Sequence, residues 1–473
     1  MRFVGRKEEL SVLEDAYATD GFQMVVVWGR RRVGKTALLD EFSRDRHALY
    51  FTGQEETNVA NLRRFSATAY AYFGSSQSAG PFEGWPDAFD YVADSAARDG
   101  GKLLLVFDEF PYAAEADPSL PSALQVAIDH RLRRMNACVV LCGSNEGFME
   151  GRVLGPKSPL YGRRTAQIRL APFDVFGVSL MLPHLAPTDV MRFYAAFGGT
   201  PYYLEQVRAE QTFEQNVERL FFRTSGLLYG EPSMLLRQEL RGPATYNSVL
   251  EAVAHGANRP KAIAERAGVE RSSVNKYLAT LVDLRILERR VPFGARRDAT
   301  RKAIYVIADP FFAFWFRFVG HNIGAVELGA GRAVARDVCL GAALPAYEAK
   351  VFERACAEWV ARENREGRLP FLATSFGSWW GTDPTLREQV DVDLVAASPS
   401  RKEIIVGEGK WRNSFDETEA IQTLEHRASL VPGSWEMRYL WLFCKRDVSA
   451  GTLRKESSRD DLRVVTVDEM LRE

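Results

Sequence analysis

The stretch that decides the fold of the N-terminal part of this chain is Gly29-Arg30-Arg31-Arg32-Val33-Gly34-Lys35-Thr36, which fits the phosphate-binding loop pattern G-x-x-x-x-G-K-[ST]. The apolar, β-branched residues 24–28 before it predict a buried strand, and residues 37–42 after it carry apolar side chains at helical spacing. A strand–loop–helix unit directs backbone N–H groups and a helix N-terminus at one point, which makes an anion cradle.

In such a cradle, Lys35 is expected to reach the β- and γ-phosphates, and the Thr36 hydroxyl to bind Mg²⁺. The alternative is a chance match in a turn rich in glycine and arginine. The flanking strand and helix argue against that alternative, so the stretch predicts binding of a nucleoside triphosphate.

The composition is that of a soluble globular protein. The chain has 473 residues, enough for about three domains, with 46% hydrophobic and 26% charged residues. A formal net charge of −1 gives no overall attraction to nucleic acid, so any basic surface must be local. The five scattered cysteines lack the spacing of a zinc site, and Cys138 and Cys142 are expected to be small core residues.

Nothing in the sequence indicates a membrane protein. The N-terminus lacks the apolar segment of a signal peptide, and the most aromatic stretch, residues 304–319, is too short and too polar to span a bilayer. A cytoplasmic protein without a membrane partner is therefore expected.

Two acids follow a second apolar run. Residues 102–107 predict a strand that ends in Asp108 and Glu109, and in a parallel sheet its carboxyl end opens onto the ligand crevice. Asp108 is expected to hold Mg²⁺ through water, and Glu109 to orient or deprotonate the attacking water. The second acid favours hydrolysis over transfer of the phosphoryl group to a substrate. The alternative is a strand with a solvated acidic end.

Further polar residues suggest the rest of a hydrolytic site. A predicted strand at 137–143 is followed by Ser144, which is positioned to touch the γ-phosphate or its water. Arg163 or Arg164 is a candidate arginine finger, although arginine pairs are also common on solvated surfaces. From residue 174 to 231 the pattern is helical and suggests a lid over the nucleotide.

Residues 243–307 predict three helices and a β-wing. Pro260 and Gly268 bound the second helix, and the third has Val274, Leu278 and Leu281 on its core face. Two strands, 287–291 and 303–307, flank a basic turn at 294–297, the expected wing. The other face of the third helix carries side chains that can reach base edges and phosphates: Ser272, Ser273, Asn275, Lys276 and Thr280.

Charge supports DNA as the partner of this segment. From Arg259 to Lys302 there are 12 Lys/Arg and 5 Asp/Glu residues, a net charge of +7 in a chain whose total is −1. A local basic patch on a winged helix is the electrostatic footprint of DNA binding. The alternative is an adaptor whose arginines pair with the acidic remainder of the chain.

The C-terminal part predicts a helix at 344–361, a strand-like segment at 371–374, and a turn around Trp379-Trp380-Gly381. Two further strands, 389–396 and 403–411, are joined by a hairpin turn. Because side chains alternate along a strand, Glu408 and Lys410 share one face, as do Asp391 and Asp393. Acids from neighbouring strands with a lysine beside them predict a Mg²⁺ site with a water-orienting cation, or else solvated strand ends.

Several motifs together resemble the archaeal-type ATPases of the AAA+/STAND-like branch of P-loop NTPases. The motifs are Phe3-Val4-Gly5-Arg6, the loop at 29–36, Asp108-Glu109-Phe110, Gly143-Ser144, residues 159–164 and Gly198-Gly199-Thr200-Pro201-Tyr202. The resemblance implies an ATPase with ATP and Mg²⁺ as cofactors, often followed by a winged helix and a domain similar to PD-(D/E)XK nucleases.

The expected fold class is α/β. We expect a P-loop NTPase core with a parallel sheet at 1–173, a helical lid at 174–235, a winged helix-turn-helix at 236–325 and an α/β restriction-endonuclease-like domain at 326–473.

The nuclease resemblance also assigns roles in the C-terminal domain. Asp393 and Glu408 match the metal-binding acids, Lys410 matches the lysine, and Glu353 is similar to the extra acid of some members. Gly409 stands where the archaeal-type ATPases more often have Cys, a position that supplies no ligand. Two interpretations stay open: an ATP-driven DNA-binding protein with a Mg²⁺-dependent nuclease-like domain, or a nucleotide-controlled regulatory switch ATPase whose inactive nuclease fold is a protein-interaction module. In either case a homo-oligomer or a partner protein is possible.

Overall fold

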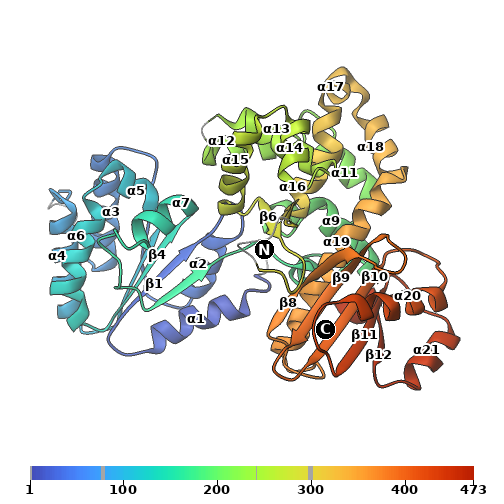
Figure 1. Ribbon diagram of the computed structural model, residues 1–473. Helices are drawn as coiled ribbons and strands as arrows, with labels where there is room; N and C mark the ends of the chain where they lie inside the picture. The colour runs from blue at the N-terminus through green and yellow to red at the C-terminus, as the bar shows by residue number, and fades with distance from the viewer. Residues whose placement is uncertain (1–2, 76–79, 241, 297–301, 473) are drawn as a thin grey trace. The chain divides into compact units, whose positions relative to one another are not determined.

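The computed structural model describes residues 3–75, 80–240, 242–296 and 302–472 (Figure 1). The chain forms two compact units. The first comprises Met1–Pro172 with Thr200–Tyr202, and the second comprises Phe173–Gly199 with Tyr203–Glu473. The phosphate loop lies in the first unit, whereas the winged helix and the C-terminal strands lie in the second.

The first unit is built on a five-stranded sheet with the order β2-β3-β4-β1-β5, in which every pairing is parallel. The strands predicted at 24–28, 102–107 and 137–143 all lie in this sheet. Their central residues are buried, which is why they read as continuous apolar runs. The strands are β1 (Phe22–Trp28), β2 (Leu49–Thr52), β3 (Leu103–Asp108), β4 (Ala137–Gly143) and β5 (Ala166–Arg169).

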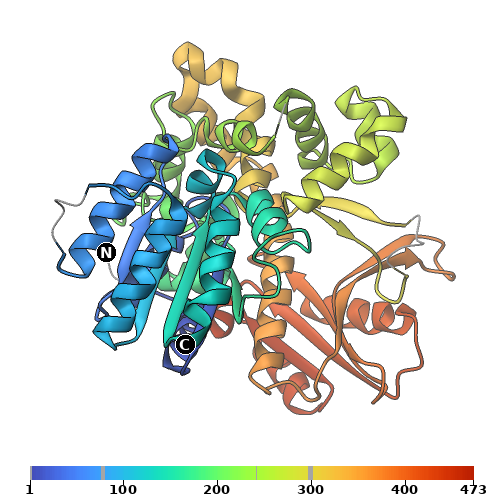
Figure 2. The same cartoon turned by 90° about the vertical axis from the view of Figure 1, so that its left-hand side faces the viewer.

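Helices cover both faces of this sheet (Figure 2). One face packs on α1 and α2 through Leu13, Leu38 and Phe42, and the other packs on α3 to α6 through residues such as Phe65 and Trp85. The helices are α1 (Lys7–Ala18), α2 (Lys35–Ser43), α3 (Asn58–Tyr72), α4 (Trp85–Asp99), α5 (Phe110–Ala116), α6 (Leu120–His130) and α7 (Glu146–Phe148).

The second unit begins with the helices predicted from residue 174 onward. Helix α11 starts with a capping box between Thr212 and Gln215. Aromatic side chains join these helices to the segment after the winged helix, as in the contact between Phe221 and Phe311. The helices are α8 (Val175–Met181), α9 (Pro187–Phe197), α11 (Phe213–Phe221), α12 (Glu231–Glu239), α16 (Pro310–Phe314), α17 (Ile323–Ala325) and α18 (Gly331–Leu340). Helix α10 (Pro201–Leu204) has its first two residues in the first unit and its last two in the second.

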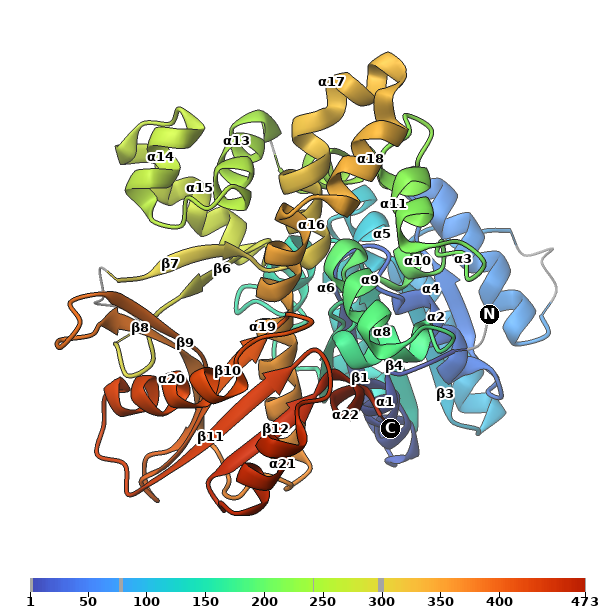
Figure 3. The ribbon, with the colours of Figure 1, turned by 90° about the vertical axis from the view of Figure 1, so that its right-hand side faces the viewer.

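The three helices and two strands of the winged helix lie where the sequence predicts them (Figure 3). The expected core residues Val274, Leu278 and Leu281 are buried. Of the expected wing, Arg296 is described, whereas Arg297 lies outside the described residues. The elements are α13 (Pro243–Ala254), α14 (Pro260–Ala267), α15 (Arg271–Asp283), β6 (Leu287–Arg290) and β7 (Ile304–Ile307), with the two strands antiparallel.

A second five-stranded sheet, of mixed type, forms the C-terminal part, with the order β12-β11-β10-β9-β8. Helix α19 (Ala343–Arg365) packs on one face and α20 (Glu417–Leu430) on the other. The remaining elements are β8 (Ser375–Thr382), β9 (Gln389–Ser398), β10 (Glu403–Lys410), β11 (Met437–Cys444), α21 (Ala450–Ser457), β12 (Leu462–Thr466) and α22 (Val467–Leu471).

Two local predictions in this part were wrong. Residues 371–374 are not a strand, and Trp379-Trp380-Gly381 is not a turn but the middle of β8. The reason is that the tryptophans pair with β9, and aromatic residues fit a pleated surface better than a turn. Between the pairs Gly377–Val395 and Trp379–Val392, one residue of β8 faces two residues of β9, Asp393 and Leu394, which forms a β-bulge.

The cysteine prediction is confirmed. Cys138 and Cys142 are fully buried free thiols within β4. Burial raises the pKa of the Cys138 thiol to about 11, so it stays protonated. Within the described residues, no helix combines the length and apolar character needed to cross a membrane.

Candidate functional site

The phosphate loop connects β1 to α2 and contains two glycines that a larger residue could not replace. One is required by its backbone conformation and the other by the lack of space for a Cβ atom. Gly34 caps α2 with a φ of +93°, a conformation that favours glycine. At Gly29 a Cβ atom would lie 2.2 Å from the Leu170 carbonyl oxygen, so the loop passes directly against the chain that follows β5. Both glycines of the pattern are therefore required by this backbone path.

Lys35 folds back along the loop. Its side chain is buried, and Nζ donates to the carbonyl oxygens of Gly29 at 2.9 Å and Arg30 at 3.1 Å. A buried ammonium group held beside the loop backbone gives the cradle a fixed positive charge. This arrangement fits the phosphates of a nucleotide.

Thr36 and Asp108 are brought together, as predicted. The Thr36 hydroxyl donates to Oδ2 of Asp108 at 3.0 Å, and the Tyr50 hydroxyl donates to the same oxygen at 3.2 Å. Burial and the Asp108 charge raise the pKa of Tyr50, so the phenol remains a donor. One hydroxyl and one buried carboxylate suit Mg²⁺, which takes only one or two protein oxygens and fills its shell with phosphates and water.

Glu109 and Ser144 are also brought together. Oε2 of Glu109 accepts from the Ser144 hydroxyl at 2.8 Å and from the Ser144 backbone N–H at 3.2 Å. Glu109 itself has a φ of +47°, which is uncommon for a residue other than glycine. The strained backbone separates the direction of Glu109 from that of Asp108, and strain of this kind collects at functional sites.

Arg6, from the N-terminal motif, braces the loop from outside. Its guanidinium donates to the carbonyl oxygens of Val33 at 3.2 Å and Ala171 at 2.6 Å, and it pairs with Glu9 at 3.0 Å. The arginine therefore links the loop to the chain after β5. Its motif was recognised in the sequence, but this role was not.

The three loop arginines have different partners. Arg30 donates to the Thr200 hydroxyl at 3.3 Å, and Arg32 lies over the Tyr202 ring at 4.7 Å. Arg31 instead donates to the hydroxyl of Tyr112, one turn of helix beyond Glu109. Burial raises the pKa of Tyr112; the nearby Arg31 charge opposes that rise and the Glu109 charge adds to it.

Arg163 and Arg164, the predicted arginine fingers, have other partners. Arg163 forms a two-pronged ion pair with Asp129 at 3.0 and 2.5 Å and donates to the Pro159 carbonyl at 2.7 Å. This hydrogen-bonded ion pair lowers the pKa of Asp129. Arg164 reaches the Leu154 carbonyl at 3.5 Å. None of these partners belongs to the phosphate loop or to the end of β3.

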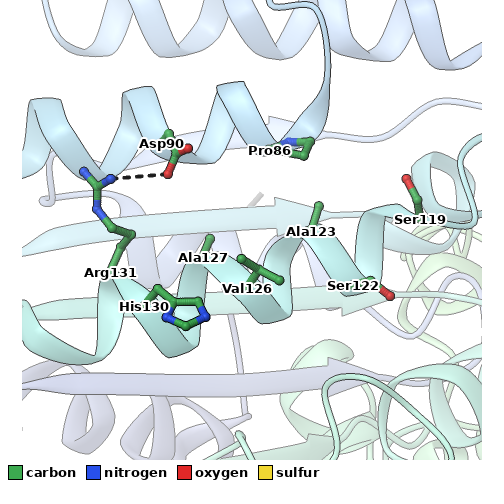
Figure 4. Close-up of a pocket in the computed structure, with 9 residues that line it drawn as sticks. All are labelled: Pro86, Asp90, Ser119, Ser122, Ala123, Val126, Ala127, His130 and Arg131. Carbon is green, nitrogen blue, oxygen red and sulfur yellow. Dashed lines mark hydrogen bonds and ion pairs between the residues drawn. The ribbon is translucent and has the colours of Figure 1, made fainter.

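A hollow of about 430 Å³ in the same unit lies between α4 and α6 (Figure 4). The Arg131–Asp90 ion pair closes one end of it, and Val126 is exposed at its mouth. None of the predicted nucleotide-binding residues lines it, so this hollow is distinct from the phosphate loop.

In the second unit, the acids and the lysine predicted from the C-terminal strands lie in one cluster. Oδ2 of Asp393 accepts from the Gly409 N–H at 2.9 Å, and Glu408 accepts from Lys410 Nζ at 2.9 Å. Arg427 on α20 donates to both carboxylate oxygens of Glu408 at 3.0 Å and lies 3.9 Å from Asp391. Sequence reasoning missed Arg427, because it stands alone in an ordinary amphipathic helix with no motif around it.

The acids of this cluster repel one another. Burial, together with the charges of Glu353 and Glu408, raises the pKa of Asp393 to about 8. Burial also raises the pKa of Glu353, against the attraction of Lys350 at 2.8 Å. Among the residues that the structure describes, no group of three or more His, Cys, Asp or Glu side chains is arranged to hold a metal ion.

The parallel sheet, the phosphate loop and the paired acids define the first unit as a P-loop ATPase domain. Residues 3–207 match the model of an ATPase domain found predominantly in Archaea. Residues 248–291 match the IclR helix-turn-helix domain, and residues 315–421 match archaeal and bacterial proteins of unknown function. The resemblance to the archaeal-type ATPases is thus confirmed, with a match to their ATPase domain followed by a match to a helix-turn-helix.

Individual relatives agree with these matches. An uncharacterized protein of Methanocaldococcus jannaschii is 28% identical over 414 residues, which cover 88% of each chain. An uncharacterized ATP-binding protein of the same organism is 48% identical over 40 residues, 8% of this chain and 68% of that protein.

Solved structures of similar proteins include the Walker-type ATPase of Pyrococcus abyssi. It is 21% identical with a TM-score of 0.49, and the match covers 67% of this chain and 96% of that one. The ORC2 protein of Aeropyrum pernix is 13% identical with a TM-score of 0.41, and the match covers 69% of this chain and 96% of that one.

Proposed function

We propose that this protein binds and hydrolyses ATP, binds DNA through its winged helix, and carries a nuclease-like C-terminal domain. The observation that carries the ATPase proposal is the convergence of site residues on three adjacent strands. The phosphate loop follows β1, Ser144 follows β4, and Asp108 and Glu109 end β3 or follow it, in a sheet where these strands are neighbours. Because all three strands are parallel, their carboxyl ends meet at one edge, where ligands bind in open α/β sheets.

Each residue of this edge has a distinct task. The loop backbone and Lys35 would hold the phosphates, and Thr36 and Asp108 would hold Mg²⁺, which supplies positive charge for the phosphate oxygens. Glu109, kept in place by Ser144, is the base or water-orienting group. A carboxylate beside the loop that is not needed for the metal favours hydrolysis as the reaction.

The charge-stabilising arginine is better sought in the loop itself than at the expected positions. Arg163 pairs with Asp129, whereas Arg31 donates to Tyr112, which lies one helical turn after Glu109. Arg31 is also adjacent to Arg30, whose carbonyl contacts the Lys35 ammonium. We therefore assign to Arg31 the contact with charge that develops on the transferred phosphoryl group.

The ATPase proposal is tested by titration calorimetry with ATP and by phosphate release. Lys35→Ala should abolish ATP binding, because it removes the buried cation of the cradle. Glu109→Gln should bind ATP and stall hydrolysis. Hydrolysis at the wild-type rate by Glu109→Gln would show that another group activates the water.

DNA binding is supported by the helix-turn-helix match and by the exposed face of α15. Ser272, Asn275 and Lys276 are exposed there, while Val274 and Leu278 hold the helix to its core. A helix of this kind can place polar side chains in the major groove. The local charge of +7 supplies the phosphate contacts.

A nuclease role for the C-terminal domain is supported by the convergence of Asp393, Glu408 and Lys410, with the two acids as metal ligands and the lysine positioned for the attacking water. The alternative is a regulatory switch ATPase whose C-terminal fold is an inert interaction module. One observation favours it: Glu408 is already neutralised by Lys410 and Arg427.

A nicking assay separates the two readings. Supercoiled DNA is incubated with wild type, Asp393→Ala and Glu408→Ala, with Mg²⁺, Mn²⁺ or EDTA, and with or without ATP. Metal-dependent nicking that both substitutions remove supports the nuclease. Its absence from wild type in every condition supports the switch.

A further inference from the structure

A backbone hydrogen bond joins the winged helix to edge strand β8 of the C-terminal sheet. The backbone N–H of Phe293, next to the wing residues, donates to the Ser378 carbonyl at 2.8 Å. Ser378 lies on edge strand β8, and it is the residue that faces the bulge at Asp393 and Leu394 of β9. The base of the wing is thus joined to the sheet edge opposite one of the clustered acids.

A second contact joins the same loop to the end of α20. The rings of Phe293 and Trp435 lie 6.2 Å apart, and Gly294 approaches Pro432 so closely that an added Cβ would lie 3.4 Å from its ring. Phe293 and Trp379 both pack against the core cluster on the sheet face that α20 covers. Arg427 stands in the last turn of this helix, so the wing base and Arg427 approach the same corner of the sheet.

The distances between these features are short compared with DNA. Neighbouring strands lie about 4.8 Å apart, so three strand spacings separate the wing base from β10, which carries Lys410, by about 14 Å. From Arg427 to the end of α20 the helix rises only about 5 Å. These lengths are of the same order as the width of the major groove of B-DNA, about 12 Å, so a duplex held at the wing is large enough for its phosphates to reach this corner.

Cations are available at both ends of this span. Arg296, three residues after Phe293, is exposed. At the acid cluster, the side chains of Lys410 and Arg427 are 25% and 23% exposed, and that of Lys350 is 66% exposed. The ammonium groups of Lys350 and Lys410 and the guanidinium of Arg427 are thus accessible to solvent, although each also contacts an acid of the cluster. Phosphate oxygens could therefore share them with Glu408 and Glu353.

We propose that a single DNA duplex is held by both the winged helix and the C-terminal domain, with its backbone lying across the wing base and against Lys410 and Arg427. This inference rests on the proposed DNA binding, but it does not require cleavage. It assigns a DNA-contacting surface to the C-terminal domain. On this surface the backbone of bound DNA lies beside the cluster of Asp393, Glu408 and Lys410.

The test measures DNA binding by the full chain, using the fluorescence anisotropy of a labelled duplex over a series of salt concentrations. The double variant Lys410→Ala/Arg427→Ala should lower the slope of log affinity against log salt by about 2, because two phosphate contacts are lost. The matched control is Arg454→Ala/Lys455→Ala on α21, which packs on β12 at the opposite edge of the sheet. The control should keep the wild-type slope.

A variant of opposite sign guards against misfolding. The side chain of Asp391 is 61% exposed beside Arg427, so Asp391→Asn should fold normally and tighten DNA binding by removing a negative charge from the path. Wild type that binds no DNA would overturn the proposed function and this inference together. If wild type binds DNA but the Lys410→Ala/Arg427→Ala and Asp391→Asn variants have the same affinity and salt slope as wild type, this inference alone is overturned. It is also overturned if the control variant Arg454→Ala/Lys455→Ala loses as much of the salt slope as Lys410→Ala/Arg427→Ala.

Discussion

At the scale of single residues, the phosphate loop shows how identical side chains acquire different tasks. Arg30 and Arg32 bind the segment Thr200–Tyr202, whereas Arg31 turns to Tyr112 at the start of α5. Sequence position alone makes the three equivalent. Their contacts separate one arginine that reaches α5 from two that contact the segment Thr200–Tyr202.

Arg31→Ala should lower the rate of ATP hydrolysis by about 100-fold or more, while ATP affinity changes only a few-fold, since the contact strengthens as charge develops. The measurements are phosphate release, ATP titration and binding of ADP with aluminium fluoride, which mimics the transferred group. Arg163→Ala is the matched control and should keep its turnover. A rate loss matched by an equal loss of ATP affinity would make Arg31 a ground-state binding residue instead.

Asp393 gives the protein a predictable pH dependence. Its pKa is raised to about 8 in the fold, against about 3.9 in an unfolded chain, so the native state holds the extra proton. The contribution of Asp393 to the free energy of unfolding should therefore be fully present below about pH 4, and should be lost as the pH rises from about 4 to about 8. Because the cluster titrates as a unit, the apparent value belongs to all of its acids.

The check is the free energy of unfolding across this pH range for wild type and Asp393→Asn, both without divalent metal. The variant cannot ionise at this position, so its stability should decline less steeply with pH. Parallel curves for the two proteins would show that Asp393 is ionised throughout and is not repelled by its neighbours.

At the scale of elements, packing and binding are divided between the faces of one helix. Leu278 of α15 is fully buried in the winged-helix core, while Lys276, two residues earlier, is exposed. The strand β9 shows a similar division, since its bulge lets Asp393 leave the regular alternation and accept a hydrogen bond from the Gly409 N–H of β10. In both cases the element is held by its apolar residues, and the polar ones are free to act.

Leu278→Ala should lower the free energy of unfolding of the second unit by about 2–5 kcal/mol, because it leaves a cavity in the core. Lys276→Ala should leave stability unchanged and reduce the salt slope of DNA binding by about 1. Chemical denaturation and anisotropy measure the two effects. If Lys276→Ala binds DNA like wild type at every salt concentration, α15 does not face the phosphates.

At the scale of the whole molecule, the chain divides into the ATPase unit and a second unit whose parts share one core. Helix α19 joins them: the Tyr347 hydroxyl donates to the carbonyls of Ala195 and Pro310, and Tyr194 donates to the partly buried Glu358. The helices after residue 173, the segment after the winged helix and the C-terminal sheet are thus one packed body. Their unfolding should be cooperative.

Calorimetry should therefore resolve two unfolding transitions. ATP with Mg²⁺ should raise the midpoint temperature of only one transition, that of the ATPase unit. At a ligand concentration 100 times the dissociation constant, the added stability of that unit is about 2.7 kcal/mol. Lys35→Ala should abolish this shift and leave both transitions in place. A single transition that ATP shifts as a whole would show that the two units unfold together.

The sequence by itself determined the elements and their chemistry where the signal is local. The phosphate loop, the strand ending in Asp108 and Glu109, the winged-helix core of Val274, Leu278 and Leu281, and the hairpin that carries Asp393 and Glu408 are all written in contiguous residues. Such patterns report backbone periodicity and turn chemistry, which need no knowledge of distant parts of the chain. The β8 tryptophans were misread because their preference for a strand depends on the partner strand β9.

Only the tertiary structure decided which residues meet. Arg31 with Tyr112, Arg427 with Glu408, and Phe293 with Ser378 are contacts between positions that no spacing relates. The same holds for the engagement of Arg163 by Asp129. An arginine or a phenylalanine in an ordinary helix or loop carries no mark of its partner, because burial and ion pairing are set by packing in space and not by order along the chain.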